Sequence, residues 1–580
     1  MKTRFFVCLF IFLYSFSYAS MSILVEADAG KRFYDYTVDS GEIESGGYAS
    51  ILDVLSVFSE INSVRRSFLN VQADISVLGG TFEQTAVLLD GIRINDPQTG
   101  HYNFEIPLTI LDIEEINIMK NPGAISGAGG YSGVINIQTK RAEKEEFKYR
   151  SIYGSYNTFR NAFLVSKKYG KLRFSLSGET GSSAGYVYGT DYKTKTFTFR
   201  SFFGDRYRLS LGFDEKDYGA YDFYTPGAGF DSREFVITRY MAFSAEPIDG
   251  FFADVYYRSH YDRFILTDTD PYYYMNKHTT GSYGINLKYS GALSDDIKAD
   301  FSYNINRDEM QSSSMGNRYR LKSSLLGRVF AAFSEIAEVN LNIGAEKRHE
   351  GGDWDIIPSI SLTRGIMPFV EFFASYAYSL RYPNFTELYY DSPANKGNPG
   401  LKPERAGSFN AGLDVNVGAI GFRGEGFIKK GTDVIDWEKD TETEALWRIN
   451  NIGEINTAGY TVSARFPADF MDISVSYTYI DSYASNSYIS KYGITYLKNK
   501  LNAGIGFEIY KCRIGLLYGY KNYDNRDDYL SVTDIRISRK FHNIFELILK
   551  AENIFDIYFE EIPGIPAMRR YFEAGLTAVY

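Results

Sequence analysis

The chain of 580 residues has little of what most enzymes and exported globular proteins use. It contains 15 prolines, five histidines and two cysteines. Because Cys8 lies in the N-terminal apolar run, only Cys512 remains for the mature protein, which excludes an internal disulfide. Beyond residue 20 no stretch of 18 apolar residues occurs, which excludes a polytopic helical membrane protein. The formal net charge of -10 argues against nucleic-acid binding.

Catalytic and metal-binding patterns are also missing. No G-x-S-x-G or H-E-x-x-H string occurs, and no cysteine cluster could hold zinc. We therefore predict that the protein is not an enzyme and needs no cofactor and no metal. Two less favoured alternatives stay open: a protease-like pair of His260 and Asp262 on a barrel rim, and calcium binding by the acidic segments 268–270 and 524–528.

The N-terminus has the form of a signal peptide. Lys2 and Arg4 precede an apolar run at residues 5–14, and Ser17 and Ala19 supply the small residues that signal peptidase reads. A membrane anchor is the alternative, but a span needs about 20 apolar residues. The sequence thus predicts a signal peptide at residues 1–19 and export.

Aromatic residues are abundant instead, at 17% of the chain, with 49 tyrosines and 44 phenylalanines. From residue 147 onward apolar and polar residues alternate, as in Tyr207, Leu209, Leu211 and Phe213, and again at 339–345 and 471–479. Alternation with aromatic strand ends is typical of strands that face lipid on one side and a polar lumen on the other.

Short breaks in this pattern give a strand count. Ten tight, turn-like breaks are each followed by enough residues for two strands and a longer loop, which predicts about 22 strands. They fall at 169–170, 204–205, 247–249, 294–296, 334–337, 365–368, 418–421, 467–469, 511–512 and 541–543. A barrel of this width has a large lumen that needs a plug.

The segment before the barrel suits that role. Residues 40–146 are rich in glycine; 50–61 has near-helical apolar spacing, while 86–90 and 113–119 are typical of short strands. We predict a transmembrane β-barrel of about 22 antiparallel strands with an N-terminal mixed α/β plug domain in its lumen. The predicted domains are a signal peptide at 1–19, an N-terminal segment at 20–39, a plug at 40–146 and a barrel at 147–580.

Several strings resemble one known family. Residues 79–97, with the string VLLDG, and then 113–118 and 133–140 are similar to the plug of TonB-dependent outer-membrane receptors. Residues 381–389, 397–404 and 552–556 resemble barrel motifs of the same family, and the chain ends at an aromatic residue, Tyr580. Length and plug look most like the vitamin B12 (cobalamin) receptor branch.

The chain departs from the family pattern at two plug positions. The family usually has Arg before the first plug glycine and an RGP string later, whereas this chain has Leu78 and then Lys120, Asn121 and Pro122. In the family those arginines contact acidic residues of the barrel wall. The contact between plug and wall is therefore expected to be weaker or differently placed.

The resemblance implies the function. A member of the family imports a scarce large nutrient, such as cobalamin or a ferric siderophore, through the Gram-negative outer membrane, driven by the inner-membrane proton gradient. Its partners are TonB with ExbB and ExbD, the small-molecule chelate or corrinoid, and outer-membrane lipid. A passive or ligand-gated porin or an adhesin barrel is the alternative.

The resemblance also suggests two sites. The TonB box, which pairs with TonB as an added strand, aligns with the residues after the predicted leader: Ile23, Leu24, Val25, Glu26 and Ala27. An apical plug loop, rich in amide, hydroxyl, imidazole and aromatic groups, is expected to face the ligand. Its candidate substrate-binding residues are Asn95, Gln98, Thr99, His101, Tyr102 and Asn103. The alternative is that Asn95 and Asp96 cap a turn and that Tyr102 packs inside the plug.

Overall fold

A computed structural model describes residues 35–580 except 68–70, 121–122, 126–127, 225–226, 334–336, 469, 485–488, 492–495, 525, 527 and 543. The predicted signal peptide and TonB box lie outside the described residues, as do Asn121 and Pro122.

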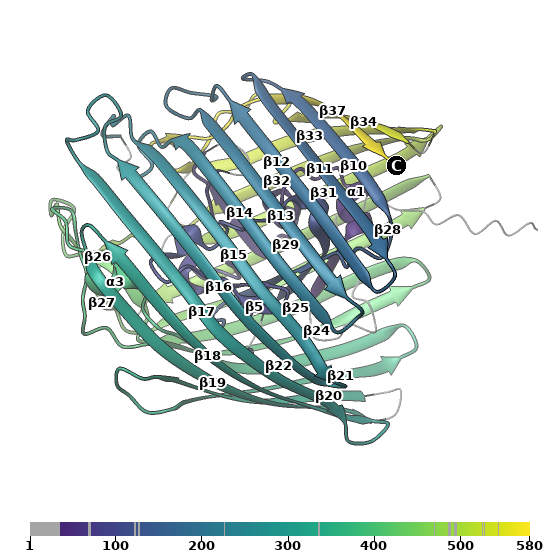
Figure 1. The fold of residues 1–580 in the computed structure, drawn as a ribbon, viewed down its shortest axis with the longest axis horizontal. Coiled ribbons are helices and arrows are strands. Elements are labelled where there is room, and N and C mark those ends of the chain that lie inside the picture. The colour runs from purple at the N-terminus through teal and green to yellow at the C-terminus, as the bar shows by residue number, and fades with distance from the viewer. Residues whose placement is uncertain are drawn as a thin grey trace, which may run out of the picture.

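The described chain forms a closed barrel of 22 antiparallel strands around an N-terminal plug (Figure 1). This confirms the predicted fold class. The barrel strands, in sequence and spatial order, are β10 (Glu146–Gly154), β11 (Thr158–Tyr169), β12 (Leu172–Ser183), β13 (Tyr192–Phe203), β14 (Tyr207–Gly219), β15 (Arg233–Ile248), β16 (Phe251–Ile265), β17 (Met275–Ala292), β18 (Ile297–Ser312), β19 (Gly316–Phe333), β20 (Ala337–Arg348), β21 (Asp355–Met367), β22 (Val370–Arg381), β24 (Glu404–Val417), β25 (Ile420–Thr432), β28 (Ile455–Ala468), β29 (Met471–Ala484), β31 (Leu497–Ile509), β32 (Cys512–Tyr523), β33 (Tyr529–Phe541), β34 (Phe545–Glu552) and β37 (Tyr571–Val579).

The alternating sequence places polar side chains inside and apolar side chains outside. In β29, Ser474 and Ser476 are buried toward the lumen, whereas Val475 between them is exposed on the outer wall. In β20, Leu341 and Ile343 are exposed in the same way. Apolar side chains on the outside and polar ones inside are the arrangement of a barrel whose outer wall meets lipid.

The short turns lie at one end of the barrel, the right-hand end in Figure 1, together with the C-terminus. Outer-membrane barrels have short periplasmic turns, so this end is periplasmic and the other, with longer loops, is outer. Each of the ten sequence breaks lies at such a turn. Two breaks, 247–249 and 365–368, overlap the end of a strand, because β15 continues to Ile248 and β21 to Met367. The pairing register shifts there, between Ala245 and Ile248 and between Gly365 and Met367. These bulges keep turn-like residues within the strands.

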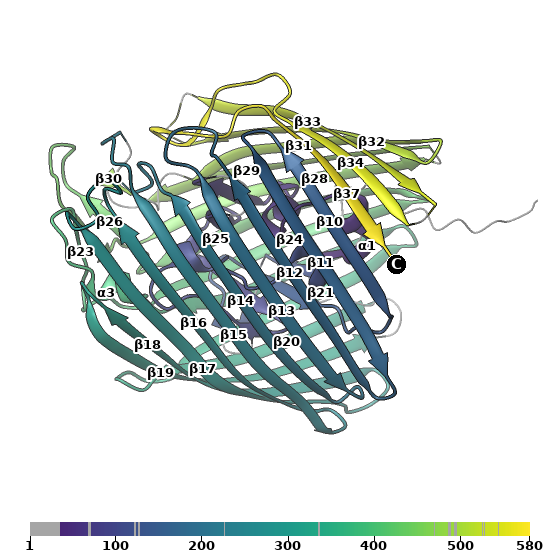
Figure 2. The same ribbon diagram turned by 45° about the horizontal axis from the view of Figure 1, so that its top comes forward.

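The plug lies in the lumen, as both ribbon views show (Figures 1 and 2). Its sheet has the order β1-β6-β9-β4-β5. The plug elements are β1 (Tyr36–Asp39), α1 (Ser40–Ser45), α2 (Ile51–Ser56), β2 (Ile61–Arg65), β3 (Ala73–Val77), η1 (Phe82–Gln84), β4 (Thr85–Leu89), β5 (Ile92–Arg93), η2 (Gly100–Tyr102), η3 (Ile110–Asp112), β6 (Ile113–Met119), β7 (Ala124–Ile125), β8 (Ala128–Gly129) and β9 (Gly133–Thr139).

The predicted plug elements are present. In α2, Ser50 accepts a hydrogen bond from the Asp53 N–H as N-cap, and Leu52, Val54 and Leu55 are buried, which explains the near-helical spacing. Strands β4 and β6 match the two predicted short strands. The plug sheet begins at Tyr36, within the segment assigned to residues 20–39, and the first barrel strand begins at Glu146.

The outer loops carry structure of their own. Helix α3 (Phe385–Tyr389) follows β22, and a small sheet has the order β23-β27-β26-β30. Its strands are β23 (Asn395–Lys396), β26 (Ile435–Lys439), β27 (Trp447–Asn451) and β30 (Ile489–Ser490), and a separate pair is β35 (Glu560–Ile562) with β36 (Ile565–Pro566). Among the described residues, no helix is both long and apolar enough to cross a membrane.

Candidate functional site

Cationic side chains of the barrel wall hold the plug. Arg200 pairs with Asp112 at 2.5 Å and Arg258 pairs with Asp96 at 2.6 Å, and all four side chains are almost completely buried. Lys500 donates to three plug carbonyls, those of Ser56, Phe58 and Ile61, at 2.7–2.9 Å. The wall thus supplies positive charge and the plug supplies acceptors.

One of the two departures from the family pattern fits this polarity, and the other reverses it. At the position of the first family arginine, the carbonyl of Leu78 accepts a hydrogen bond from Lys429 of the wall at 3.4 Å. Lys120 is the exception, because it belongs to the plug and contacts Glu425 of β25. Its ammonium group is fully buried and also lies 3.7 Å from Glu60. The contact between plug and wall is therefore differently placed, which is one of the two expectations.

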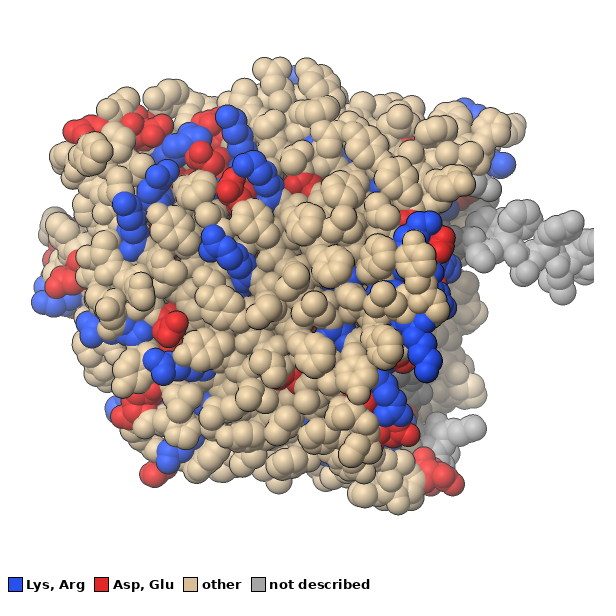
Figure 3. Space-filling view, in the orientation of Figure 1, with Lys and Arg blue, Asp and Glu red and all other residues tan. Residues whose placement is uncertain are grey.

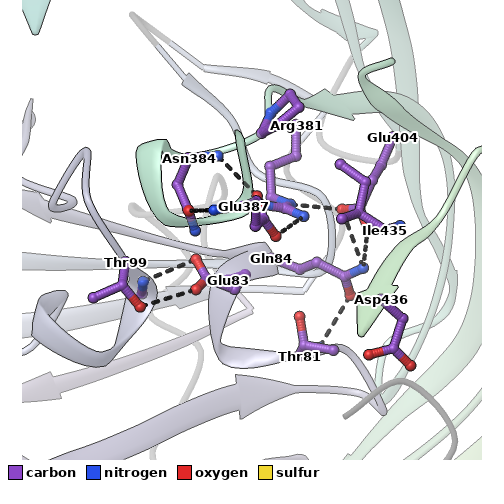
Figure 4. A network of polar contacts seen from close by, with 12 residues as sticks. Thr81, Glu83, Gln84, Thr99, Arg381, Asn384, Glu387, Glu404, Ile435 and Asp436 are labelled. Atoms are coloured by element: carbon purple, nitrogen blue, oxygen red, sulfur yellow. Dashed lines mark hydrogen bonds and ion pairs between the residues drawn. The ribbon is translucent and has the colours of Figure 1, made fainter. Parts of the chain in front are cut away.

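Two of the barrel motifs found in the sequence, 381–389 and 397–404, meet in one network (Figure 4). The Arg381 guanidinium lies between two carboxylates, with a bidentate pair to Glu387 at 2.9 and 2.9 Å and a bond from Nε to Glu404 at 2.6 Å. Asn384 caps α3 by accepting from the Glu387 N–H, which holds Glu387 in place. Glu404 also accepts the Ile435 N–H at 2.7 Å. The spacing of these motifs therefore encodes an ion network that fastens an outer loop to the wall.

The plug docks onto this network. Gln84 donates to Glu404 at 3.3 Å, and the Phe385 and Thr386 N–H groups of α3 donate to the Pro97 and Gln98 carbonyls at 2.9 and 3.0 Å. The apical plug loop is thereby joined to an outer loop of the barrel through its backbone. Movement of either segment must break these bonds.

Glu83 lies at the centre of this contact. Its carboxyl group accepts hydrogen bonds from the Gly100 N–H at 2.8 Å and from the Thr99 hydroxyl at 3.2 Å, and it faces Glu387 across the interface (Figure 4). Burial, together with the nearby Glu387 charge, raises the pKa of Glu83 from 4.5 to about 8. Glu83 is therefore protonated when the plug is seated at neutral pH.

This shift predicts a pH-dependent plug. A raised pKa in the seated state contributes stability below pH 4.5, which is lost as pH rises through about 8. We expect protection of the plug from proteolysis to fall between pH 5 and pH 9, and the Glu83→Gln variant to flatten the change by about 1 to 2 kcal/mol, allowing for solvent contact. Glu114→Gln, at an exposed plug residue, is the matched control. A wild-type profile in Glu83→Gln would contradict this assignment.

The predicted substrate-binding residues lie together in the apical loop, but most of them bond to the protein itself. Asn95 bonds to the backbone of Val87 and Thr85, and Asn103 accepts from the Asp96 N–H. Thr99 accepts from the His101 N–H as the cap of η2. These contacts give the loop a fixed shape.

The larger loop side chains reach other elements. His101 Nδ1 lies 2.8 Å from Asp74 and the ring stacks on Phe82, while burial lowers the pKa of His101. Tyr102 donates to Glu234 of β15 at 2.5 Å, and its ring packs at a tilt of 35° against that of His260. Gln98 is buried. Tyr102 thus packs against the barrel wall rather than inside the plug.

A cavity of about 560 Å³, part of it open to solvent, lies where this loop meets the wall. Asn95 and Asn103 line it, together with residues that the sequence analysis did not select. These are Glu83, Arg93, Asp96, Pro97, Tyr256, Ser282, Asn306, Asp308, Arg320, Lys322, Arg381, Tyr382 and Asn384. Apart from Tyr256, the lining residues that belong to barrel strands lie in the outer half of those strands, because β22 ends at Arg381 on the outer side and β19 begins there.

The cavity has more cations than available carboxylates. Asp308 is shared by Arg320 at 3.3 Å and Lys322 at 2.9 Å, and Asp96 is already paired with Arg258. Arg93 bonds only to Asn95, at 3.2 Å, among the residues that the structure describes, and burial lowers its pKa. Three cations, Arg93, Arg320 and Lys322, thus face two buried carboxylates, those of Asp308 and Glu346, and the excess of positive charge favours an anionic ligand.

Arg320 and Lys322 could have been selected from their inward positions in an alternating strand, but the sequence does not show which plug residues they face.

Over the described ranges, no three His, Cys, Asp or Glu side chains are arranged to hold a metal ion.

Comparison with known proteins agrees with this architecture. The family described as "TonB dependent receptor-like, beta-barrel" matches residues 120–554, and "TonB-dependent Receptor Plug Domain" matches residues 35–134. The crystal structure of the siderophore receptor PirA from Acinetobacter baumannii is similar at 13% identity, covering 94% of this chain and 98% of that chain, with a TM-score of 0.75.

Two further structures have the same fold. The copper transporter OprC has 15% identity over 94% of this chain and 98% of that chain, with a TM-score of 0.80. The FrpB iron transporter from Neisseria meningitidis has 14% identity over 94% of this chain and 99% of that chain, with a TM-score of 0.76.

Proposed function

The chain belongs to the TonB-dependent receptor family, and from this premise we propose that it imports an anionic metal chelate of the siderophore class through the outer membrane. The observation that carries the proposal is the excess of cations, Arg93, Arg320 and Lys322, over free carboxylates in the cavity between plug and wall. The ligand is expected to be too large for passive pores, because a plug fills the lumen.

The apical loop has two roles in this proposal. Asn95 and Asn103 line the cavity, so their amides contact the ligand. Gln98, Thr99, His101 and Tyr102 hold the loop in position through the contacts described above. Relatives support the ligand class: PirA is a siderophore receptor and FrpB an iron transporter.

Energy for release of the ligand comes, in this proposal, from the inner-membrane proton gradient through TonB, ExbB and ExbD. The plug is held by buried ion pairs such as Arg200 with Asp112, and separating such a pair leaves buried charges without a partner, which costs free energy. A pull on the N-terminal segment supplies the work. The alternatives make different predictions. A passive or ligand-gated porin would transport the ligand whether or not the gradient is present, and an adhesin would not transport it at all.

A corrinoid is the second candidate ligand, on the strength of the sequence resemblance to the vitamin B12 receptor branch. The two ligand classes differ in charge, because an anionic chelate uses the cavity cations and a corrinoid without a net negative charge does not. Variants that remove cavity cations therefore distinguish the two ligand classes, because they should weaken binding of the anionic chelate and not of the corrinoid.

The test is direct binding to purified protein, with a ferric triscatecholate as anionic probe and cyanocobalamin as uncharged probe. We expect the double variant Arg93→Gln, Lys322→Gln to weaken binding of the ferric chelate by roughly tenfold to a hundredfold, since each charged contact contributes about 1 to 3 kcal/mol. Lys430→Gln, at an exposed lysine paired with Glu454 on the outer wall, is the control.

Two outcomes would overturn the proposal. One is tight cobalamin binding with no binding of the ferric chelate, which would favour the corrinoid. The other is chelate binding that is the same in wild type and in the double variant, which would move the site away from the cavity. Uptake of a bound chelate that persists after the proton gradient is collapsed would favour the passive barrel.

A further inference from the structure

We infer that the outer half of the wall formed by β15, β16 and β17 binds the phosphate groups of the phosphorylated glycolipid, lipid A, in the outer leaflet. Three lipid-facing cations carry the inference: Arg239, Arg263 and Lys277. The proposal depends on the outer-membrane location, not on the transported ligand.

These side chains point to lipid and not to the lumen. In β15 the residues at even positions, such as Thr238 and Tyr240, are buried toward the inside, whereas Arg239 and Met241 are exposed. Lys277 is exposed in the same way between the buried Asn276 and His278. Arg263 lies between Asp262, which is buried, and Phe264. A cation on the lipid face of a barrel is costly unless it reaches a polar or charged group.

Two of the cations face each other. Arg263 of β16 and Lys277 of β17 are direct cross-strand partners on the outer wall. Like charges in this position repel one another. The Arg263 guanidinium lies over the Phe235 ring at 5.4 Å, and its Nε is buried without a hydrogen-bond partner in the described part of the chain. An anion between the two cations would relieve the repulsion.

Arg239 lacks a counter-ion as well. Its cross-strand neighbours are Phe213 of β14 and Ser259 of β16. No hydrogen bond or ion pair links its side chain to another described residue. It lies nearer the membrane centre than Arg263, four residues along β15 from Phe235, and its long side chain can extend toward the outer headgroups.

Nearby cations on the same wall have carboxylates opposite or beside them, unlike Arg239, Arg263 and Lys277. Lys195 and Lys193 of β13 lie opposite Glu215 and Asp217 of β14, and the Lys195–Glu215 distance is 2.7 Å. Arg233 pairs with Asp217 at 2.7 Å. Arg239, Arg263 and Lys277, by contrast, lie on three adjacent strands, and no ion pair links any of them to another described residue.

The position of the three cations near the outer ends of their strands indicates which lipid they bind. Figure 3 shows charged side chains toward both ends of the strands, the outer end being at the left, while the middle of this wall is mostly uncharged. The turns assign this end to the outer surface, where the exposed leaflet carries phosphorylated glycolipid. A phosphate group accepts several charge-assisted hydrogen bonds from Arg and Lys.

The test is retention of lipid A by the full-length protein in detergent, measured by native mass spectrometry with added diphosphoryl lipid A, dephosphorylated lipid A or phosphatidylglycerol. We expect wild type to retain diphosphoryl lipid A, and the triple variant Arg239→Gln, Arg263→Gln, Lys277→Gln to bind it roughly tenfold more weakly. The triple variant Lys193→Gln, Lys195→Gln, Arg307→Gln removes the same charge from compensated positions and should bind as wild type does.

Heat-modifiable migration in gels confirms that each variant has a folded barrel, and Arg263→Gln alone serves if the triple variant does not assemble. Equal loss in both triple variants, equal retention of phosphatidylglycerol, or undiminished binding by the first triple variant would each overturn the proposal. Ferric chelate binding is measured on the same samples, so failure here is distinguishable from failure of the import proposal.

Discussion

Replacement of Arg381 by Met is expected to release the outer loop that docks on the plug. The change leaves the buried carboxylates of Glu387 and Glu404 without their cation. Removing one partner of a buried ion pair costs about 3 to 5 kcal/mol, because the remaining charge cannot regain water. Arg381 serves two carboxylates, so this single change has a larger effect than loss of any surface pair.

The amides of Phe385 and Thr386 report the effect directly, because they donate to the Pro97 and Gln98 carbonyls of the plug. Hydrogen exchange in peptides that contain them should become roughly a hundredfold faster or more in Arg381→Met. Arg381→Lys should recover little, since an ammonium group cannot make the bidentate contact.

Arg405→Met is the matched control. Arg405 of β24 pairs with Asp355 of β21 at 2.8 Å, but its side chain is 30% exposed, so the expected cost is about 0 to 1 kcal/mol. Adding Glu387→Gln to Arg381→Met should restore part of the protection, because one unpaired charge is removed. Unchanged exchange in Arg381→Met would show that the backbone bonds hold the loop without the ion network.

The fold could be predicted because its signals are local. Alternation such as that of residues 207–213 follows from one wall facing lipid, and each turn is marked by its own residues. The breaks that overlap strand ends show the limit of this reasoning. Pro247 and Gly365 have turn chemistry, yet bulges keep them within β15 and β21, and a bulge depends on the partner strand rather than on local sequence.

The candidate ligand site could not be predicted in the same way, because it is formed by contacts between residues that lie far apart in the sequence. Arg200 and Asp112 are 88 residues apart, and Arg258 and Asp96 are 162 apart. Polar residues such as Tyr102 have chemistry suited to a ligand, but the same hydroxyl also suits Glu234 of the wall. Only the placement of plug against barrel distinguishes the two roles, which is why Arg93, Arg320 and Lys322 were not selected.

The plug sheet has an edge strand that bears on energy coupling. Strand β1 is the first described strand, and among the described strands it pairs with β6 alone, from Tyr36 opposite Ile118 to Asp39 opposite Glu115. Asp35 just before it accepts the Lys120 N–H at 2.7 Å and lies 3.5 Å from Arg423 of the wall. A pull on the preceding chain would therefore reach β1 first, and an edge strand can be peeled without breaking the central pairs.

Proline at Leu24 or Val25 should abolish uptake and leave ligand binding intact. Both residues lie in the predicted TonB box, outside the described residues, and proline removes the backbone N–H that strand addition to TonB requires. The cavity cations and the apical loop are untouched, so affinity for the ferric chelate should equal that of wild type. Leu24→Ala, which keeps the N–H, is the control and should retain most uptake. Radiolabelled chelate accumulation, compared with surface binding at 0 °C, separates the two steps. Normal uptake in both proline variants would place the box elsewhere in the chain, whereas loss of binding together with uptake would point to faulty assembly and not to coupling.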